Sequence, residues 1–179
     1  MKSPVHPCQH RFWNRLLAAL IVLSALTGCG SLPQTRESPP VAERAPASEE
    51  TTQKANDVVL YALGLIDTGY RFGGKNPAAG FDCSGMVSYI YTQAARLKIS
   101  GSATDIARRS TPVDLQQLRP GDLVFFNTRH KPFSHVGIYI GDDRFVHAPS
   151  ESGLARIRTD SLKNRYFATR LEAARSLLD

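Results

Sequence analysis

The hydrophobic pattern of this chain changes once, at the turn sequence Arg119-Pro120-Gly121-Asp122, and this change limits the folds that the chain can adopt. Before the turn, apolar residues recur at helical spacing. After it, they form short runs that are typical of strands and are separated by turn residues. Helices that precede a set of short neighbouring strands favour an α+β fold with one antiparallel sheet. The sequence therefore predicts an α+β domain of about 120 residues, which is enough for one core.

Three helices are expected before this turn. The first covers Asn56–Thr68, because its apolar residues recur at helical spacing and Gly69 follows as a stop signal. The other two expected helices are Asp82 (or Ser84) to about Leu97 and, capped by Ser102 or Thr104, Asp105–Arg109.

Five short strands are expected after the turn, namely Leu123–Phe126, His135–Ile140, Arg144–Ala148, Ala155–Arg158 and Phe167–Leu171. The second and third of them can form a hairpin. If its loop has an odd length and is centred on Gly141, His135 lies directly opposite His147, with Cβ atoms about 5 Å apart on one face of the sheet. A two-residue loop would break this register.

The N-terminus has the features of an export signal. Met1–Arg15 contains three basic residues and no acid, and Leu16–Leu26 follows with only Ser24 polar. A membrane-spanning helix needs about 20 apolar residues, so this shorter stretch indicates the h-region of a secretory signal peptide, with a short buried helix as the alternative. Leu26-Thr27-Gly28-Cys29 comes next and resembles the lipobox of bacterial lipoproteins. Cys29 is therefore expected to receive a diacylglyceryl group and to hold the chain on a membrane through acyl chains such as palmitate.

The residues after Cys29 predict a location and a tether. Gly30, rather than Asp, follows the lipidated position, which resembles the signal for the outer membrane of a diderm bacterium, facing the periplasm. From Gly30 to about Thr52 the chain has four Pro, no aromatic residue and no apolar periodicity, and this composition favours a disordered linker. The predicted organisation is a signal peptide at 1–28, a lipidated Cys and linker at 29–52, and one domain at 53–179.

The net charge is partly a property of the export signal. Removal of residues 1–28 takes away three basic residues and no acid, so the net charge falls from +6 to +3. The chain has no basic stripe with interleaved aromatic residues, and a nucleic-acid partner is not expected. The remaining positive balance suits an anionic cell envelope, but ordinary surface lysines and arginines explain it equally well.

Cysteine usage directs attention to one residue. Cys8 leaves with the signal and Cys29 carries lipid, so Cys83 alone remains, and no intramolecular disulfide can form in an oxidising compartment. Cys83 lies in the first turn of the second predicted helix, where unpaired N–H groups and the helix dipole favour the thiolate and can stabilise an oxyanion. A small buried hydrophobic residue is the alternative interpretation.

His135 and His147 complete a candidate catalytic group with Cys83. One imidazole would act as a base toward the thiol while the other fixes its orientation and tautomer. Two satisfied polar residues on a sheet remain an alternative. A zinc site is another, although the spacings are not those of a metal finger and no fourth ligand stands out. His130 lies in a polar loop and is interpreted as incidental. No metal or cofactor is expected.

Several sequence blocks carry a family resemblance. In order, they are Tyr70-x-Phe-Gly-Gly, Phe81–Gly85, Pro120–Phe126, Ser134–Gly141 and Phe145–Ala148. Together they resemble the NlpC-type cell-wall endopeptidases, within the papain-like cysteine peptidases, over about Asn56 to Ala174. The resemblance implies a helix-borne nucleophile packed on a small antiparallel β-sheet. It also implies hydrolysis of amide bonds in peptidoglycan stem peptides, either γ-D-Glu to diamino acid or a D,D cross-link, without a cofactor.

The resemblance also assigns roles by position. It implies that Cys83 is the nucleophile, His135 the general base and His147 the third polar residue, which orients His135. Tyr70 matches a tyrosine beside the oxyanion site.

Asp82 and Ser84 match positions that help to bind the stem peptide, although either one is equally suited to cap a helix. The sequence departs from the family pattern at Phe72, where Trp is frequent. It also departs at Lys98–Thr104, which lacks the Leu-Pro-Arg-Thr/Ser stretch that walls the cleft in many members. These departures leave the catalytic group intact and leave the substrate subsites open.

Two other classes of function remain open at this point. One is a non-catalytic lipoprotein that binds peptidoglycan or a partner enzyme, because a fold can lose its chemistry and keep its shape. The other is an acyl or amide transferase that uses the same three residues. A cell-wall hydrolase also needs restraint, so an adaptor or regulator protein is an expected partner, but no residue identifies it.

Overall fold

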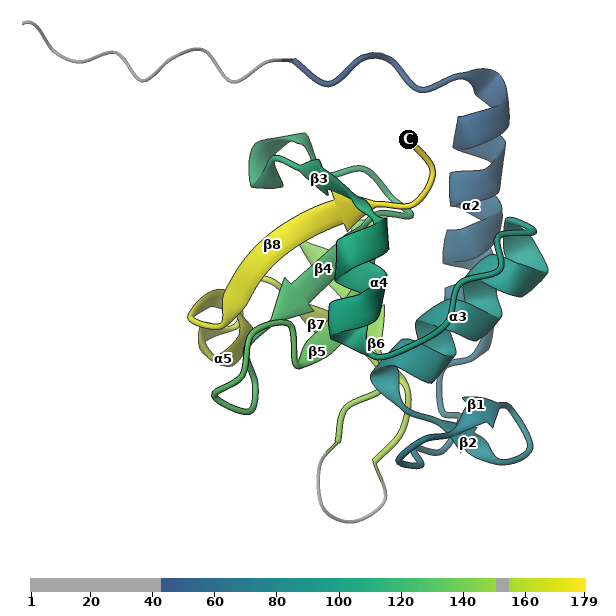
Figure 1. Ribbon diagram of the computed structural model, residues 1–179, viewed down its shortest axis with the longest axis vertical. Helices are drawn as coiled ribbons and strands as arrows, with labels where there is room; N and C mark the ends of the chain where they lie inside the picture. Colours follow the sequence, from purple (N-terminus) through teal and green to yellow (C-terminus); the bar gives the residue numbers. More distant parts are fainter. Residues whose placement is uncertain (1–42, 151–154) are drawn as a thin grey trace, which may run out of the picture. The chain divides into compact units, whose positions relative to one another are not determined.

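An antiparallel sheet of six strands is the main element of the part of the chain that the computed structural model describes, residues 43–150 and 155–179. Its strand order is β3-β8-β4-β5-β6-β7, and a separate two-stranded sheet is formed by β1 and β2 (Figure 1). The predicted α+β class is confirmed. The strands are β1 (Lys75–Asn76), β2 (Gly80–Phe81), β3 (Thr111–Val113), β4 (Leu123–Phe126), β5 (His135–Gly141), β6 (Arg144–His147), β7 (Arg158–Ser161) and β8 (Leu171–Ser176).

Each helix begins at a polar side chain that caps it. Ser48 caps α2 by accepting a hydrogen bond from the backbone N–H of Thr51, and Asp82 caps α3 in the same way from Gly85. At α4, Ser102 and Asp105 form a reciprocal capping box. The helices are α2 (Glu49–Gly64), α3 (Cys83–Ala94), α4 (Ala103–Arg109), the 3-10 turn η2 (Leu115–Gln117) and α5 (Arg165–Ala168).

The first helix is displaced from its predicted range. It covers Glu49–Gly64 instead of Asn56–Thr68, because the Ser48 cap and the acidic first turn start it before the apolar pattern begins. The predicted second and third helices are present, but α3 ends at Ala94 rather than about Leu97, and α4 begins at Ala103 rather than Asp105, with Ser102 as its cap.

The strand predictions hold in the middle of the sheet and shift at its end. β4, β5 and β6 lie where expected to within one residue. The last two predicted strands were placed too early, since β7 covers Arg158–Ser161 and β8 covers Leu171–Ser176. The range Phe167–Leu171 begins instead in α5, because Asn164 caps that helix through the backbone N–H of Tyr166. Strand β3 was not predicted from the sequence.

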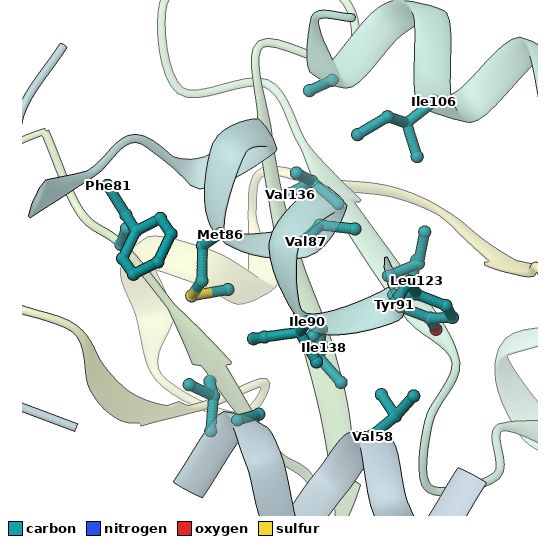
Figure 2. Close-up of a cluster of buried hydrophobic side chains, with 14 of the residues drawn as sticks. Val58, Phe81, Met86, Val87, Ile90, Tyr91, Ile106, Leu123, Val136 and Ile138 are labelled. Carbon is teal, nitrogen blue, oxygen red and sulfur yellow. The ribbon is translucent and has the colours of Figure 1, made fainter. Parts of the chain in front are cut away.

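Helices α2 and α3 pack on the sheet through one apolar cluster. Figure 2 shows α3 side chains meeting those of β4, β5, α2 and α4. The fully buried residues of this cluster include Val58, Phe81, Met86, Val87, Ile90, Tyr91, Ile106, Leu123 and Ile138. The Tyr91 hydroxyl donates to the carbonyl oxygen of Gly121, so this large polar side chain is buried with its hydrogen bond satisfied.

The opposite face of the sheet is also covered. Val124, Phe126 and Phe145 pack there with Phe167 of α5. All four residues of β4 are therefore buried, which explains why the continuous apolar run Leu-Val-Phe-Phe could be recognised as a strand but not assigned to one face.

The segment before α2 is attached to the domain by Arg44. Its guanidinium donates to both carboxylate oxygens of Asp122, at 2.6 and 3.0 Å, and to Asp179 at 2.8 Å. Asp122 is only 2% exposed, so this ion pair is mostly withdrawn from water. The linker predicted at 29–52 is thus corrected in its described part, because residues 43–52 contain this clamp and the first turn of α2. Residues 29–42 lie outside the described residues, as do Cys29 and the predicted signal peptide.

Within the described residues, the helices are all too short or too polar to cross a bilayer.

We predict that Arg44→Ala lowers the free energy of unfolding by about 3 kcal/mol, because it leaves the buried Asp122 carboxylate without its cation. The measurement is chemical denaturation of the chain from residue 41. Arg108→Ala is the matched control, since it also removes one guanidinium from a carboxylate, but the Arg108–Asp105 pair is exposed and is expected to contribute little. Equal losses for both variants would show that the Arg44 clamp does not stabilise the domain.

Candidate active site

Cys83 is the first residue of α3, as the sequence predicts, and the packing of this helix directs it toward the sheet. Asp82 caps the helix, with its Oδ1 accepting from the backbone N–H of Gly85 at 2.7 Å and from the Ser84 hydroxyl at 3.0 Å. The backbone of Val136, the residue after His135 on β5, is close enough to the thiol to lower its pKa. The nucleophile candidate therefore lies against the strand that carries the predicted base.

The loop before α3 is held close to the helix by glycines. A Cβ atom at Gly85 would clash with the carbonyl oxygen of Gly74, and one at Gly74 would clash with that of Gly80. The loop is also tied down by the Gly73 backbone N–H, which donates to Asp82 Oδ2 at 3.0 Å. The glycine pattern of this segment thus provides close backbone approach around Cys83.

The two histidines meet, although the predicted register is wrong. Ile138 pairs with Val146 and Tyr139 with Phe145, so His147 lies across from Gly137 and not from His135. His135 and His147 are diagonal neighbours on one face, and such neighbours are within reach of long or aromatic side chains. Gly137 makes room between them, because a Cβ there would clash with the Phe145 ring that packs on His147.

A hydrogen-bonded chain runs outward from His135. His135 Nε2 lies 2.8 Å from His147 Nδ1, and His147 Nε2 lies 2.8 Å from Oδ2 of Asp160 on β7. The same Asp160 oxygen accepts from Arg158 Nε at 2.9 Å. Sequence reasoning missed Asp160, because only the pairing of β7 with β6 brings it beside His147, and the predicted strand at Ala155–Arg158 stopped before it.

Both imidazoles are almost completely buried. His135 is 5% exposed and His147 is 1% exposed, with the rings of Phe145 and Phe167 about 5 Å from His147. Burial lowers the pKa of His135 to about 3, and the neighbouring His147, Arg129 and Arg158 act in the same direction. At neutral pH His135 is therefore an uncharged imidazole, the form that can accept a proton.

The protonation state expected for Cys83 differs from the one found. Burial raises the pKa of the thiol to about 11, although hydrogen bonds from the backbone of Val136 and Ser84 act in the opposite direction. In this resting state desolvation outweighs the helix terminus, so Cys83 is a neutral thiol. A thiol beside a neutral imidazole requires proton transfer during attack rather than a preformed thiolate.

Two cavities meet at His135. The larger, of about 490 Å³, contains Cys83 and His135 together with the three predicted substrate residues Tyr70, Asp82 and Ser84. The smaller, of about 320 Å³, lies on the side of His147 and Tyr166. Both cavities are lined by His135, Arg129 and Ser150.

The predicted substrate residues are brought to the cleft, but Asp82 and Ser84 also serve the fold. The two carboxylate oxygens of Asp82 accept hydrogen bonds from the start of α3 and from the loop at Gly73. The Ser84 hydroxyl also donates a hydrogen bond to Asp82. Burial raises the pKa of Tyr70, and the neighbouring Arg129 acts in the opposite direction. The other charged lining residues are Lys75 and Lys131, so cations predominate in the cleft.

No cluster of three or more His, Cys, Asp or Glu side chains suited to a metal ion occurs in residues 43–150 and 155–179.

Comparison with known proteins agrees with this geometry. Residues 67–176 match the NlpC/P60 family. The murein DD-endopeptidase MepH of Escherichia coli (strain K12) is 34% identical over 138 residues, which are 75% of this chain and 50% of the relative. The gamma-DL-glutamyl hydrolase of Bacillus subtilis (strain 168) is 35% identical over 119 residues, 66% of this chain and 28% of the relative.

A solved structure gives the same result. A Staphylococcus aureus protein described as similar to a lipoprotein of the NLP/P60 family matches with a TM-score of 0.63 and 28% identity, over 78% of this chain and 45% of that chain. The chain thus spans half or less of the length of these three proteins. Because the match covers the helix of Cys83, both histidine strands and most of the sheet, the chain belongs to the NlpC/P60 family.

Proposed function

We propose that this chain is a peptidoglycan endopeptidase that hydrolyses amide bonds of cell-wall stem peptides or their cross-links through Cys83, His135 and His147. The observation that carries the proposal is the convergence of these residues. Cys83 and His135 line one cavity, and His135 is hydrogen-bonded at 2.8 Å to His147 behind it. A nucleophile, a base and a group that orients the base are the components of covalent acyl transfer.

In the proposed reaction His135 takes up a proton and gives it away twice, once in each half of the cycle. During attack, the Cys83 thiol gives its proton to His135 while sulfur bonds to the amide carbonyl carbon. The resulting imidazolium then protonates the leaving amine as the C–N bond breaks, which leaves a thioester on Cys83. Water attacks the thioester with His135 again as the base, releasing the carboxylic acid and regenerating the thiol. No cofactor or metal takes part.

The cleft supports a substrate with carboxylate groups. Lys75, Arg129 and Lys131 line it against the single acid Asp82, whose oxygens are already bonded within the chain. Stem peptides carry free carboxylates, and these would be attracted to such a surface. Tyr70 is proposed to lie beside the oxyanion, and Asp82 and Ser84 to contact the stem peptide.

The relatives' names leave two bonds to be distinguished. One relative is named a murein DD-endopeptidase and the other a gamma-DL-glutamyl hydrolase. The first name corresponds to a D,D cross-link and the second to a γ-glutamyl bond, and both are amides within reach of the same chemistry.

The N-terminal residues support a location in the cell envelope. The proposal is export by the signal peptide at 1–28, lipidation at Cys29 and attachment to the outer membrane, facing the periplasm. An adaptor or regulator protein would restrain the hydrolase there.

Cys83→Ala is expected to abolish the release of fragments from purified sacculi, because it removes the attacking sulfur. The digest should use residues 41–179, so that the Arg44 clamp is kept, with products identified by mass spectrometry. The product masses also distinguish a cross-link from a γ-glutamyl bond. Ser88→Ala is the matched control, since it lies on the same helix and its hydroxyl donates to the backbone carbonyl of Ser84. Fragment release by Cys83→Ala at the wild-type rate would exclude the mechanism.

His135→Ala is expected to reduce kcat more severely than His147→Ala, because His135 transfers the protons and His147 only orients it.

The lowered pKa of His135 also predicts the pH dependence. A free histidine is mostly protonated at pH 5, whereas His135, with a pKa of about 3, stays neutral. Activity should therefore persist to pH 5, measured as kcat/KM on a defined stem peptide. An acidic limb at pH 6.5 would contradict this environment for His135.

Cys29→Ser is expected to abolish incorporation of a fatty-acid label and to release the chain from the membrane fraction, because serine lacks the thiol that accepts the diacylglyceryl group. The measurement is metabolic labelling followed by fractionation of the envelope. Cys8→Ser is the control, because Cys8 lies within the predicted signal peptide. Retained label in Cys29→Ser would refute the anchor.

A further inference from the structure

The described strands place a carboxylate at the end of the histidine pair, at a position that the Cys83-His135-His147 group does not include. Asp160 lies on β7 opposite Phe145, and Arg158, two residues earlier, lies opposite His147. The Asp160 side chain therefore reaches His147 diagonally across β6 and β7, as His135 reaches it across β5 and β6. Its Oδ2 lies 2.8 Å from His147 Nε2.

Asp160 remains ionised, and this fixes the direction of its hydrogen bond. Burial raises the pKa of Asp160, but hydrogen bonds from His147 and Arg158 outweigh that effect and hold the pKa below its usual value. An ionised carboxylate can only accept hydrogen bonds. His147 Nε2 must therefore carry a proton and donate a hydrogen bond to Asp160.

The direction of the His147–Asp160 hydrogen bond also determines the direction of the bond between His147 and His135. In a neutral histidine one ring nitrogen donates and the other accepts. When the His147 ring is neutral and donates from Nε2, its Nδ1 accepts, and His135 Nε2, 2.8 Å away, is then the donor. Neutral His135 is then unprotonated at Nδ1, which makes that nitrogen the available base.

From this geometry we propose that Asp160 is a positioning residue, which fixes the tautomers of His147 and His135 so that His135 Nδ1 is free to accept the proton of Cys83. The inference rests on the proposed function for the identity of the reaction, but the tautomers themselves are a property of the resting protein. After proton transfer, His135 is positive, and Asp160 supplies the negative charge at the far end of the chain.

The groups that act on the pKa of His135 are Arg129 from the β4–β5 segment, His147 from β6, and Arg158 and Asp160 from β7. The cavity that His135 shares with Cys83 also contains the titratable side chains Tyr70, Lys75, Asp82 and Lys131. Among the groups that act on this pKa, Asp160 raises it, and His147 and the two arginines lower it. Removing Asp160 therefore weakens the base as well as releasing its tautomer.

Two substitutions separate the roles of the Asp160 oxygen and its charge. The same Oδ2 atom accepts from both His147 and Arg158, so an amide oxygen in that place can keep both hydrogen bonds. Asp160→Asn is expected to keep the tautomers and lose activity only a few-fold. Asp160→Ala removes the acceptor, and kcat is expected to fall by about tenfold to a hundredfold with little change in KM, as when an outer hydrogen-bond partner of an imidazole is lost.

The decisive measurement is ¹⁵N NMR of the histidine rings in the full chain, held in detergent, alongside kcat and KM on a defined stem peptide. Signals are assigned from His135→Ala and His147→Ala. In the wild type, both rings are expected in the form protonated at Nε2, and in Asp160→Ala a population protonated at Nδ1 should appear. Asp57→Ala is the matched control, because it also removes a carboxylate that accepts one side-chain hydrogen bond, from Gln53 on α2.

The outcomes separate this inference from the proposed function. Wild-type His135 protonated at Nδ1, or Asp160→Ala with wild-type tautomers and wild-type kcat, would overturn the role of Asp160 while leaving the peptidase intact. If the wild type itself cleaves no stem peptide, the proposed function fails, and the ring signals still decide the role of Asp160. A loss of kcat in Asp160→Ala that equals the loss in Asp57→Ala would also refute the inference.

Discussion

The packing of α3 on β5 is the constraint on which the candidate site depends. Met86, Val87 and Ile90 fill the space between the helix and the sheet, and this fixes the depth at which the helix begins (Figure 2). Cys83 opens that helix, and its thiol meets the backbone of Val136, one residue from His135. Because side chains in a close-packed core have little freedom to shift, the apolar cluster aligns the candidate nucleophile with the candidate base.

Burial of the site makes neutral side chains the resting state. The same desolvation raises the pKa of Cys83 and lowers that of His135, so the proton stays on sulfur until the substrate arrives. A helix terminus alone favours the thiolate, and the sequence therefore suggested one. The opposing effect depends on how completely α3 covers β5, which only the packed structure contains. We therefore expect the charges on sulfur and on His135 to form only during attack on the substrate.

Features that depend on only a few neighbouring residues could be predicted well from the sequence. The cap at Asp82, the capping box at Ser102 and the buried run of β4 are each readable within a few residues. Relations between distant residues were less predictable. The hairpin register was two residues from the expected one, and Asp160 was missed because its role depends on the pairing of β7 with β6. Arg44 was placed in a tether because its partners, Asp122 and Asp179, are remote in sequence.

The outward course of the histidine chain explains how two buried imidazoles can be tolerated. A polar network in a protein interior is costly when any member lacks a partner. Here the bonds to His135 and Asp160 occupy both ring nitrogens of His147, and the side chain of Asp160 is 21% exposed and paired with Arg158. The full negative charge thus lies where water and a guanidinium can stabilise it, while its influence reaches inward through hydrogen bonds. Moving that carboxylate inward to contact His135 directly would increase its effect on the base, but it would also desolvate the charge. Because His147 lies between them, the Asp160 carboxylate can stay near water while His135 stays buried.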